Sequence, residues 1–321
     1  MIRAFVYESN KILKEFSDLE SLRPHCRKNM LWIDIEGIEG HELQFLKETF
    51  DFHPLSLEDS SGDISSPKVE HYPNYLFIVF HAIKFDADDE KLTTIEVDIF
   101  LGKNYVVTVH KSPVRSIAWN LEKCRRTPEL TLGMGSDFLV HNILDGMVDH
   151  YGPVCEEMDD VIELLQDEVM VDPDVPELRS IFALKRSIMY LRRVMVPQRD
   201  TLNQMARGDY PLIERKNLVY FRDIYDHINR HYESTENMRE LVSSTLELYV
   251  SSVANRTNDV MRVLTIVATI MLPLTLIASI YGMNFHFIPG AQDEYGFFWV
   301  LLGMALLGVI MFWIFKKKKW F

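Results

Sequence analysis

Three consecutive residues, Gly282, Met283 and Asn284, lie where an apolar run of the sequence ends. A glycine at this point lets the backbone turn out of a helix and expose its carbonyl oxygens, and Asn284 adds a carboxamide oxygen. Neutral oxygens of this kind suit a strongly hydrated cation such as Mg²⁺, which gives up its waters reluctantly and can be held through its hydration shell. An ordinary helix C-cap explains the same residues. The interpretation as a cation site therefore depends on the position of the motif at the end of an apolar run.

A stripe of small, polar or soft residues leads along the preceding helix to this motif. Alternating steps of four and three residues from Glu247 keep to one helical face. They reach Ser251, Ala254, Asn258, Met261, Thr265, Ala268, Leu272, Thr275 and Ser279. A coiled-coil seam would carry large aliphatic residues there. Small residues alone would also permit close helix packing in a membrane, but three polar residues on one face favour contact with water.

Carboxylates and histidines elsewhere in the chain could bind metal ions. Asp223, His227 and His231 follow one another at i, i+4 spacing on one helical face and could hold a transition metal, but the solvated face of a long polar helix is the favoured explanation. Residues 156–169, EEMDDVIELLQDEV, are strongly acidic. Such a run is typical of the solvated face of a helix.

Two runs without charged residues predict the elements that position the stripe and the motif. Residues 263–280 and 297–315 have about 18 and 19 residues, the length that a helix needs to cross roughly 30 Å of hydrocarbon. Buried core helices are the alternative, but neither run keeps a charged face for water. Two membrane spans cannot enclose a pore alone, so a conduit lined by the stripe requires a ring of several copies.

The distribution of charge predicts the orientation of these spans. The second span is followed directly by Lys316, Lys317, Lys318 and Lys319, whereas the loop between the spans contains acidic residues but no Lys or Arg. The positive-inside bias therefore places both termini and the large N-terminal part in the cytosol of a cell (inner or plasma) membrane. The first residues contain no apolar signal region, which agrees with this placement.

The pattern of elements predicts the domain organisation. Residues 1–135 alternate short β-rich and helical segments and indicate a cytosolic α/β or α+β domain. One of these segments, TIEVDIFLGKNYVVTVH, is predicted to form a β-hairpin. Residues 136–213 indicate a helical hairpin region with an acidic tip. Residues 214–281 contain no glycine or proline before Pro273 and predict one very long stalk helix that continues into the first span at about residue 261. We expect an extracytoplasmic loop at 282–296, the second span at 297–315 and a basic cytosolic C-terminus at 316–321.

The motif and the long helix together resemble the CorA family of magnesium and cobalt transporters. The family signature is Gly-Met-Asn at the end of the first of two C-terminal membrane helices, here within YGMNF. The segments YFRDIYDHI, LELYVSSVANRTNDVMRVLTIVATIMLPLTLIASIYGMNF and KKKKWF also look like family sequence. The resemblance covers essentially the whole chain and is densest over the last hundred residues.

The resemblance implies a funnel-shaped homopentamer in which the long helix lines a pore. The residues that match the family's pore lining are Asn258, Met261, Leu264, Ala268, Leu272, Thr275 and Asn284. Most of them fall on the stripe, with Leu264 in place of its neighbour Thr265. By the resemblance, Gly282, Met283 and Asn284 form the selectivity filter, and Met261 and Leu264 belong to a hydrophobic constriction that closes by dewetting.

The resemblance also implies cation sites between subunits that regulate the pore. Asp223 matches one ligand, and Asp86 is a looser match for its partner, for which a solvated turn is an equal explanation. Opposed carboxylates repel unless a cation lies between them, so loss of internal Mg²⁺ would let the subunits separate. The four lysines would form a basic ring near the acidic helical tip, or anchor the chain at the anionic lipid surface.

One part of the loop departs from the family pattern. Where the family commonly has Met-Pro-Glu, this chain has Ile288, Pro289 and Gly290, so the loop carboxylate that gathers cations is missing there. Asp293 and Glu294 are candidates to replace it.

Composition and missing motifs exclude several other classes of function. The chain of 321 residues has 47 Asp and Glu against 34 Lys and Arg, which gives no electrostatic support for nucleic acid as a partner. It contains no ATP-binding Gly-x-x-x-x-Gly-Lys loop, no Gly-x-Ser-x-Gly and no HExxH, and Cys26, Cys124 and Cys155 form no metal or disulfide pattern. We therefore expect no enzyme and no organic cofactor, with Mg²⁺ as both substrate and regulatory ligand.

The sequence thus predicts a homo-oligomeric, pentameric channel for divalent cations that takes up Mg²⁺, with Co²⁺ or Ni²⁺ as further substrates, along the membrane potential. Two alternatives stay open. One is a zinc-transporting member of the same superfamily, and the other is an α/β sensor or enzyme that the two spans merely tether to the membrane.

Overall fold

The computed structural model describes residues 1–8, 12–26, 29–62, 64–283, 288–289, 293–318 and 320. These residues form two compact units, Met1–Leu246 and Glu247–Phe321. Helix α7 (Leu218–Tyr281) contributes to both units because it continues without a break across the boundary. The expected fold class is confirmed, with a mixed α/β domain, a very long stalk helix and a second apolar helix near the C-terminus.

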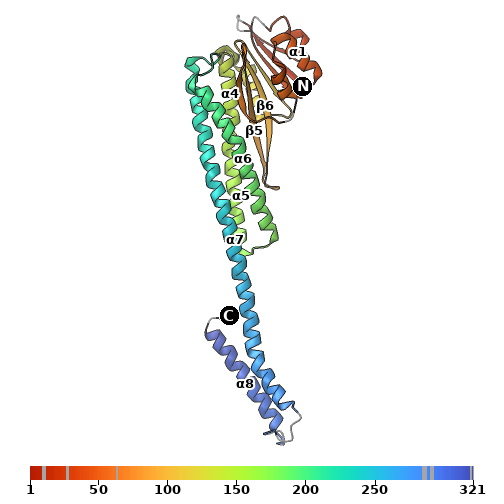
Figure 1. Ribbon diagram of the computed structural model, residues 1–321, viewed down its shortest axis with the longest axis vertical. Coiled ribbons are helices and arrows are strands. Elements are labelled where there is room, and N and C mark those ends of the chain that lie inside the picture. Colours follow the sequence, from red (N-terminus) through yellow and green to blue (C-terminus); the bar gives the residue numbers. More distant parts are fainter. Residues whose placement is uncertain are drawn as a thin grey trace. The chain divides into compact units, whose positions relative to one another are not determined.

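A seven-stranded mixed sheet forms the centre of the first unit (Figure 1). Its strands are β1 (Ile2–Tyr7), β2 (Leu13–Phe16), β3 (Met30–Glu36), β4 (Lys68–His71), β5 (Tyr75–Asp86), β6 (Lys91–Gly102) and β7 (Tyr105–His110). They lie in the order β2-β1-β3-β7-β6-β5-β4, and within the described residues every neighbouring pair is antiparallel except β3 with β7. The predicted hairpin is confirmed as β6 and β7.

Both faces of this sheet are covered, which explains why its central strands have nearly continuous apolar sequences. Alternate residues of β5 point to opposite sides. Ile78 and Phe80 join a core with α3 (Arg115–Arg126), α4 (Ser136–Asp149) and the start of α7, whereas Phe77 and Val79 join a second core with α1 (Gly40–Phe50) and α2 (Pro54–Ser61). The sheet is therefore the middle layer of three.

Two long helices, α5 (Tyr151–Val171) and α6 (Val175–Arg207), extend from this domain beside α7 (Figure 1). The carboxylate of Asp174 caps the start of α6 in a reciprocal capping box with Glu177. The helix ends at Gly208, whose φ of 82° lies in the left-handed region that favours glycine. The helical region at 136–213 is thus interrupted near Pro173 and ends at Gly208.

Helix α7 begins at Leu218, slightly later than the expected start at residue 214, because a short 3-10 turn (Arg215–Asn217) comes first. The carboxylate of Asp137 fixes this turn by accepting hydrogen bonds of 2.9 Å from the backbone N–H of Glu214 and from the Asn217 amide. The chain enters the stalk helix only after this anchor.

The first half of α7 is packed against its own chain. Its buried residues recur at spacings of three, four and seven, and they are Phe221, Ile224, Ile228, Thr235, Met238, Val242 and Thr245. The Thr235 hydroxyl lies 3.4 Å from Met195 Sδ of α6, and Gln166 of α5 donates a hydrogen bond of 2.9 Å to the Thr245 hydroxyl. Packing on α5 and α6 thus stabilises a helix too polar to be stable alone.

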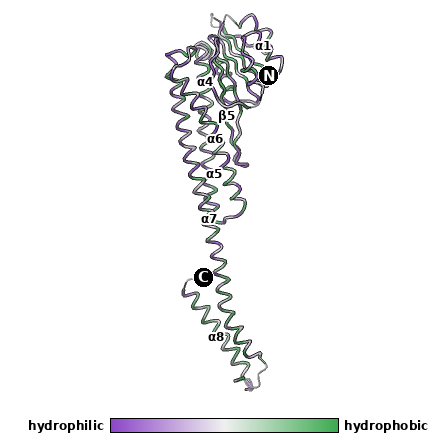
Figure 2. Tube along the Cα trace, in the orientation of Figure 1, coloured by the Kyte–Doolittle hydropathy of each residue, from purple (hydrophilic) through white to green (hydrophobic). Residues whose placement is uncertain are grey.

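The second unit consists of the remainder of α7, helix α8 (Gly296–Lys317) and the described residues near them. Both helices contain an 18-residue window with a mean hydropathy of 2.4, and only 6% and 0% of those windows are buried. Figure 2 shows this apolar character along α8 and the end of α7. A core helix of a water-soluble protein would be mostly buried, so these two helices are suited to lipid.

Candidate functional site

The stripe on α7 lies on the helix face that α8 leaves free. Ile266 is buried, and Ile270, Pro273 and Ile277 are half-buried. At 100° per residue these positions lie roughly 150° from the centre of the stripe. A Cβ atom built at Gly308 of α8 would lie 3.8 Å from Leu274, so α8 packs on this side of α7. The opposite face is available for other contacts.

The six pore-lining positions that the resemblance places on α7 are all exposed in the chain. Met261 is 54%, Leu264 60% and Leu272 70% exposed. The three remaining positions, Asn258, Ala268 and Thr275, are exposed as well. Large apolar side chains at Met261 and Leu264 thus project from the same helix surface as the small and polar ones.

Hydroxyl groups of α7 leave oxygen acceptors without breaking the helix. Thr265 donates its hydroxyl proton to the carbonyl of Met261, and Thr269 donates to that of Thr265, each at 2.7 Å. The hydroxyl oxygens keep lone pairs for water. An ion pair of 3.1 Å between Arg262 and Asp259 lies just before the apolar segment.

The end of α7 explains the glycine of the Gly-Met-Asn motif. The Gly282 N–H donates to the carbonyl of Ala278 at 2.9 Å, and the Met283 N–H donates to that of Ile280 at 3.3 Å. A Cβ atom at Gly282 would lie 3.2 Å from the Ala278 carbonyl oxygen, which is tighter than ordinary contact. Met283 is 49% exposed. Asn284, the third residue of the expected filter, lies outside the described residues, as does Gly290 of the loop.

A second candidate site lies in the first unit, between α4 and α7. Asp145 and Asp149 of α4 and His227 of α7 bring possible ligand atoms within 4.8 Å of one another. The His227 ring lies 3.5 Å from an Asp149 oxygen and 3.7 Å from an Asp223 oxygen. The structure therefore places His227 between Asp223, as their spacing predicts, and the two carboxylates of α4, with Asp149 and Asp223 on opposite ring nitrogens.

The electrostatics of this cluster favour a bound cation. Burial, together with the negative charges of Asp149 and Asp223, raises the pKa of Asp145 to about 6, although His227 opposes the rise. The carboxylates thus repel one another, and a divalent cation among them would remove that repulsion.

His231 lies outside the group of possible ligands that Asp145, Asp149 and His227 form. Its ring is stacked on Tyr151 with centroids 6.4 Å apart, and a Cβ atom at Gly152 would lie 3.3 Å from it. Burial lowers the pKa of His231, and the neighbouring His227 adds to this effect. Residues at i, i+4 spacing point in slightly different directions from the helix, so two successive ones can contact different neighbours.

Asp86 lies at the end of β5, in the turn that joins it to β6. Its carboxylate accepts backbone hydrogen bonds from Asp88 at 3.2 Å and Asp89 at 3.4 Å. Within the described part of one chain, it serves its own turn and lies outside the cluster.

The basic C-terminus follows α8 directly. Lys316 and Lys317 belong to the last turn of α8, and Lys317 Nζ lies 5.2 Å from the ring centroid of Trp313. The Lys318 N–H donates to the Ile314 carbonyl at 3.0 Å. Lys319 lies outside the described residues. The arrangement is typical of a membrane-interface anchor.

Comparison with known proteins identifies the family. The model of the family described as "CorA-like Mg2+ transporter protein" matches residues 27–317. The cobalt/magnesium transport protein CorA of Thermotoga maritima is 38% identical over 312 residues, which is 95% of this chain and 87% of that protein. The putative metal ion transporter YfjQ of Bacillus subtilis is 37% identical over 290 residues, covering 90% and 89% of the two chains.

A solved structure has the same fold. The complete structure of the CorA magnesium transporter from Methanocaldococcus jannaschii superposes with a TM-score of 0.83 at 24% identity, and the match covers 100% of this chain and 99% of that one. The family match over most of the chain, together with two apolar helices suited to lipid, shows that this protein belongs to the CorA family of Mg²⁺ transporters and is a membrane transporter of divalent cations, not an enzyme.

Proposed function

We propose that five copies of the chain form a channel that admits Mg²⁺, and also Co²⁺, along the membrane potential. The observation that carries this proposal is the stripe of α7, which is free of charge through the membrane segment and lies opposite the face that packs on α8. A ring of α7 helices with this stripe inward encloses a conduit that two helices alone cannot form. The relatives support the choice of ions, since the relative from Thermotoga maritima is named a cobalt/magnesium transport protein.

The roles along the conduit follow from the chemistry of the side chains. Asn284, with Gly282 and Met283, forms the outer filter and binds the hydration shell of the entering ion through neutral oxygens. Met261 and Leu264 form a hydrophobic gate that closes when it loses water. Ala268, Leu272 and Thr275 line the conduit between the gate and the filter, and Asn258 lines it on the other side of the gate. Without a carboxylate in the span, the ion passes largely hydrated.

The cluster of Asp145, Asp149, Asp223 and His227 supports a regulatory role for cytosolic Mg²⁺. Asp86 of a neighbouring copy completes this site across the subunit boundary, since its carboxylate is exposed on the β5–β6 turn. Mg²⁺ between the opposed carboxylates holds neighbouring subunits together. Its loss at low internal concentration lets them move apart and opens the pore, so the transported ion limits its own entry.

The topology of the channel follows from its charges. Residues 1–135, 136–213 and the first part of the stalk lie in the cytosol with the lysines at 316–319, and residues 282–296 face the outside. A divalent cation that enters along this potential gains roughly 4.6 kcal/mol per 100 mV, so no ATP site is required.

Flux into liposomes tests the proposal. The full chain is reconstituted with an inside-negative potential, and entry of Mg²⁺, Co²⁺ and Zn²⁺ is measured for the wild type, for Asn284→Ala and for Asn237→Ala. The last is a matched control, because Asn237 is exposed on α7 in the first unit. We expect Mg²⁺ and Co²⁺ to enter through the wild type and the control, and flux through Asn284→Ala to be lost while the oligomer persists.

The other outcomes are equally informative. Entry of Zn²⁺ without Mg²⁺ or Co²⁺ would assign the chain to a zinc-transporting branch. Full Mg²⁺ flux through Asn284→Ala would remove Asn284 from the filter, and a monomeric wild type would contradict the ring.

A further inference from the structure

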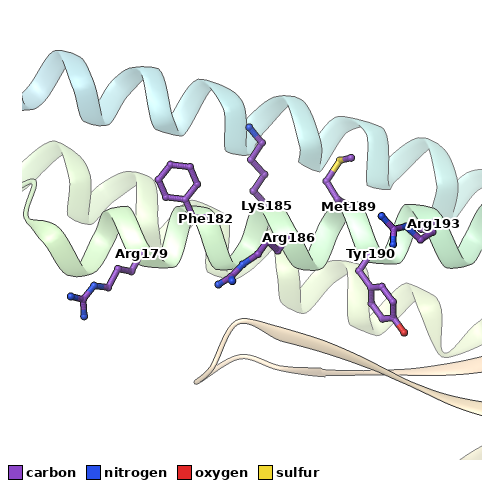
Figure 3. Close-up of a pocket in the computed structure, with 7 residues that line it drawn as sticks. All are labelled: Arg179, Phe182, Lys185, Arg186, Met189, Tyr190 and Arg193. Atoms are coloured by element: carbon purple, nitrogen blue, oxygen red, sulfur yellow. The ribbon is translucent and has the colours of Figure 1, made fainter. Parts of the chain in front are cut away.

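A row of cationic and apolar side chains on α6 has no part in the conduit or in the metal cluster. Arg179, Phe182, Arg186, Met189 and Arg193 recur at alternating spacings of three and four, so they follow one face of the helix for roughly 21 Å. With two flanking residues, Lys185 and Tyr190, they line a shallow groove of 660 Å³. Figure 3 shows the seven side chains on α6 between α7 and the β5–β6 hairpin. We call Arg179, Phe182, Arg186, Met189 and Arg193 the basic row.

The cations of this row have no partners in their own chain. Arg179, Arg186 and Arg193 are exposed, as is the flanking Lys185, and within the described residues none of the four forms an ion pair or a side-chain hydrogen bond. By contrast, Arg192 on the same helix pairs with Glu236 of α7. The apolar members are also uncovered, since Phe182 is 47% and Met189 44% exposed.

A row of opposite charge with the same period lies on α5. Glu156, Asp160, Glu163 and Asp167 follow one another at spacings of four, three and four, and all four are exposed. This acidic row also forms no ion pair within the described part of the chain. Leu164, 65% exposed, supplies an apolar side chain next to it. Although α5 and α6 pack together in one chain, the two rows do not pair with each other.

We propose that the basic row of α6 docks on the acidic row of α5 in a second copy of this chain. The two rows match in period and differ in sign, and each carries exposed apolar side chains that such a contact would cover. Two different patches on one chain make a head-to-tail contact, which closes into a ring of copies. The inference rests on the proposed oligomer and specifies which helices meet at its cytosolic subunit boundary.

A cross-linking experiment tests the contact directly. Two versions of the full chain with different affinity tags, one carrying Arg186→Cys and the other Glu163→Cys, are coexpressed and treated in membranes with a flexible bis-maleimide. The native Cys26, Cys124 and Cys155 are buried and give little background. We expect a product that carries both tags. The matched control replaces the first chain by Lys47→Cys, on the exposed surface of α1, and should give no such product.

Charge reversal of whole rows tests the energetics without an assumed register. Reversal of the basic row (Arg179→Glu, Arg186→Glu and Arg193→Glu) should weaken subunit association in detergent by roughly tenfold or more, because several attractive pairs become repulsive. Reversal of the acidic row (Glu156→Lys, Glu163→Lys and Asp167→Lys) should have a similar effect. The chain with both reversals should regain the association of the wild type.

The outcomes separate this inference from the proposed function. A wild type that assembles and conducts Mg²⁺, but shows neither the two-tag product nor rescue by the double reversal, would overturn the contact and leave the channel intact. Binding of inorganic tripolyphosphate to the wild type that is lost only on reversal of the basic row, without rescue, would assign the groove to a small anion instead. A wild type that never assembles would refute the oligomer itself.

Discussion

Replacement of Asp98 by asparagine should stabilise the protein at neutral pH. Asp98 lies on β6 and is 3% exposed, and its Oδ1 atom has no hydrogen-bond partner among the described residues. Burial and, to a smaller extent, the negative charge of Glu96 raise its pKa to about 8, although a hydrogen bond from Ser60 opposes the rise. Asp98 is therefore protonated in the folded protein at pH 7.

The size and sign of the effect follow from proton linkage. The carboxyl has a pKa of 3.8 in the unfolded chain and about 8 in the folded one. The folded state holds the proton more tightly than the unfolded chain does. The contribution of the Asp98 carboxyl to stability is therefore fully present below about pH 3.8 and is lost as the pH rises towards 8. At 1.36 kcal/mol per pKa unit, the disadvantage relative to a permanently neutral side chain is about 4 kcal/mol at pH 7. Asparagine keeps the shape of the neutral acid, so we expect Asp98→Asn to gain about 2 to 4 kcal/mol at pH 7 and about 1 kcal/mol at pH 4.5.

Thermal unfolding of the full chain in detergent measures this difference. At pH 7 the apparent Tm of Asp98→Asn should exceed that of the wild type by about 5 to 10 °C, given the size of the first unit. Asp88→Asn removes an exposed carboxylate from the turn between β5 and β6 and should change little. A variant no more stable than the wild type at pH 7, or one with the same advantage at pH 4.5, would refute the buried-acid explanation.

Three further predictions concern the cluster, the gate and the stalk. Asp145→Asn should reduce the rise in Tm that Mg²⁺ gives relative to EDTA, since it removes one repelling carboxylate from the cluster; an unchanged Mg²⁺ response would place the ion elsewhere. Leu264→Asn should raise Mg²⁺ flux at high internal Mg²⁺, because a polar side chain keeps the constriction hydrated, and unchanged closure would argue against a gate at this residue. None of the side chains at 247–262 is buried in one chain, so backbone hydrogen exchange there should be slow only in the assembled oligomer, and slow exchange in a monomer would contradict this.

The elements with a strong local signal could be predicted from the sequence. The stalk helix was evident because its period is 3.6 residues and it lacks glycine and proline before Pro273, and the membrane spans because neither contains a charge. The β6–β7 hairpin and the apolar strands β3 and β5 were likewise evident. Strands β2 and β4 were missed, since each has only four residues and carries charges, as edge strands commonly do.

The candidate sites depend on packing that no local pattern contains. Asp145 and Asp149 stand at i, i+4 spacing on α4, which is a detectable signal, but only the packing of α4 beside α7 brings them to His227. The same packing separates His231 from that cluster. The burial of Asp98 was equally hidden, because an acidic residue in an amphipathic strand is ordinarily expected on the solvent side.

A seven-residue repeat along α7 determines which residues of this helix pack against their own chain. Met238, Thr245, Ile266 and Pro273 differ by multiples of seven residues, and all four lie on the face that packs against the same chain, first on α5 and α6 and later on α8. A strict seven-residue repeat keeps one face of a helix towards its partners if the helix supercoils slightly to the left. The stripe that ends near Ser279 follows the same repeat on the opposite face. The repeat is not interrupted in the sequence between the polar and apolar halves of α7, so the proposed ring could use one face of this helix along its whole length.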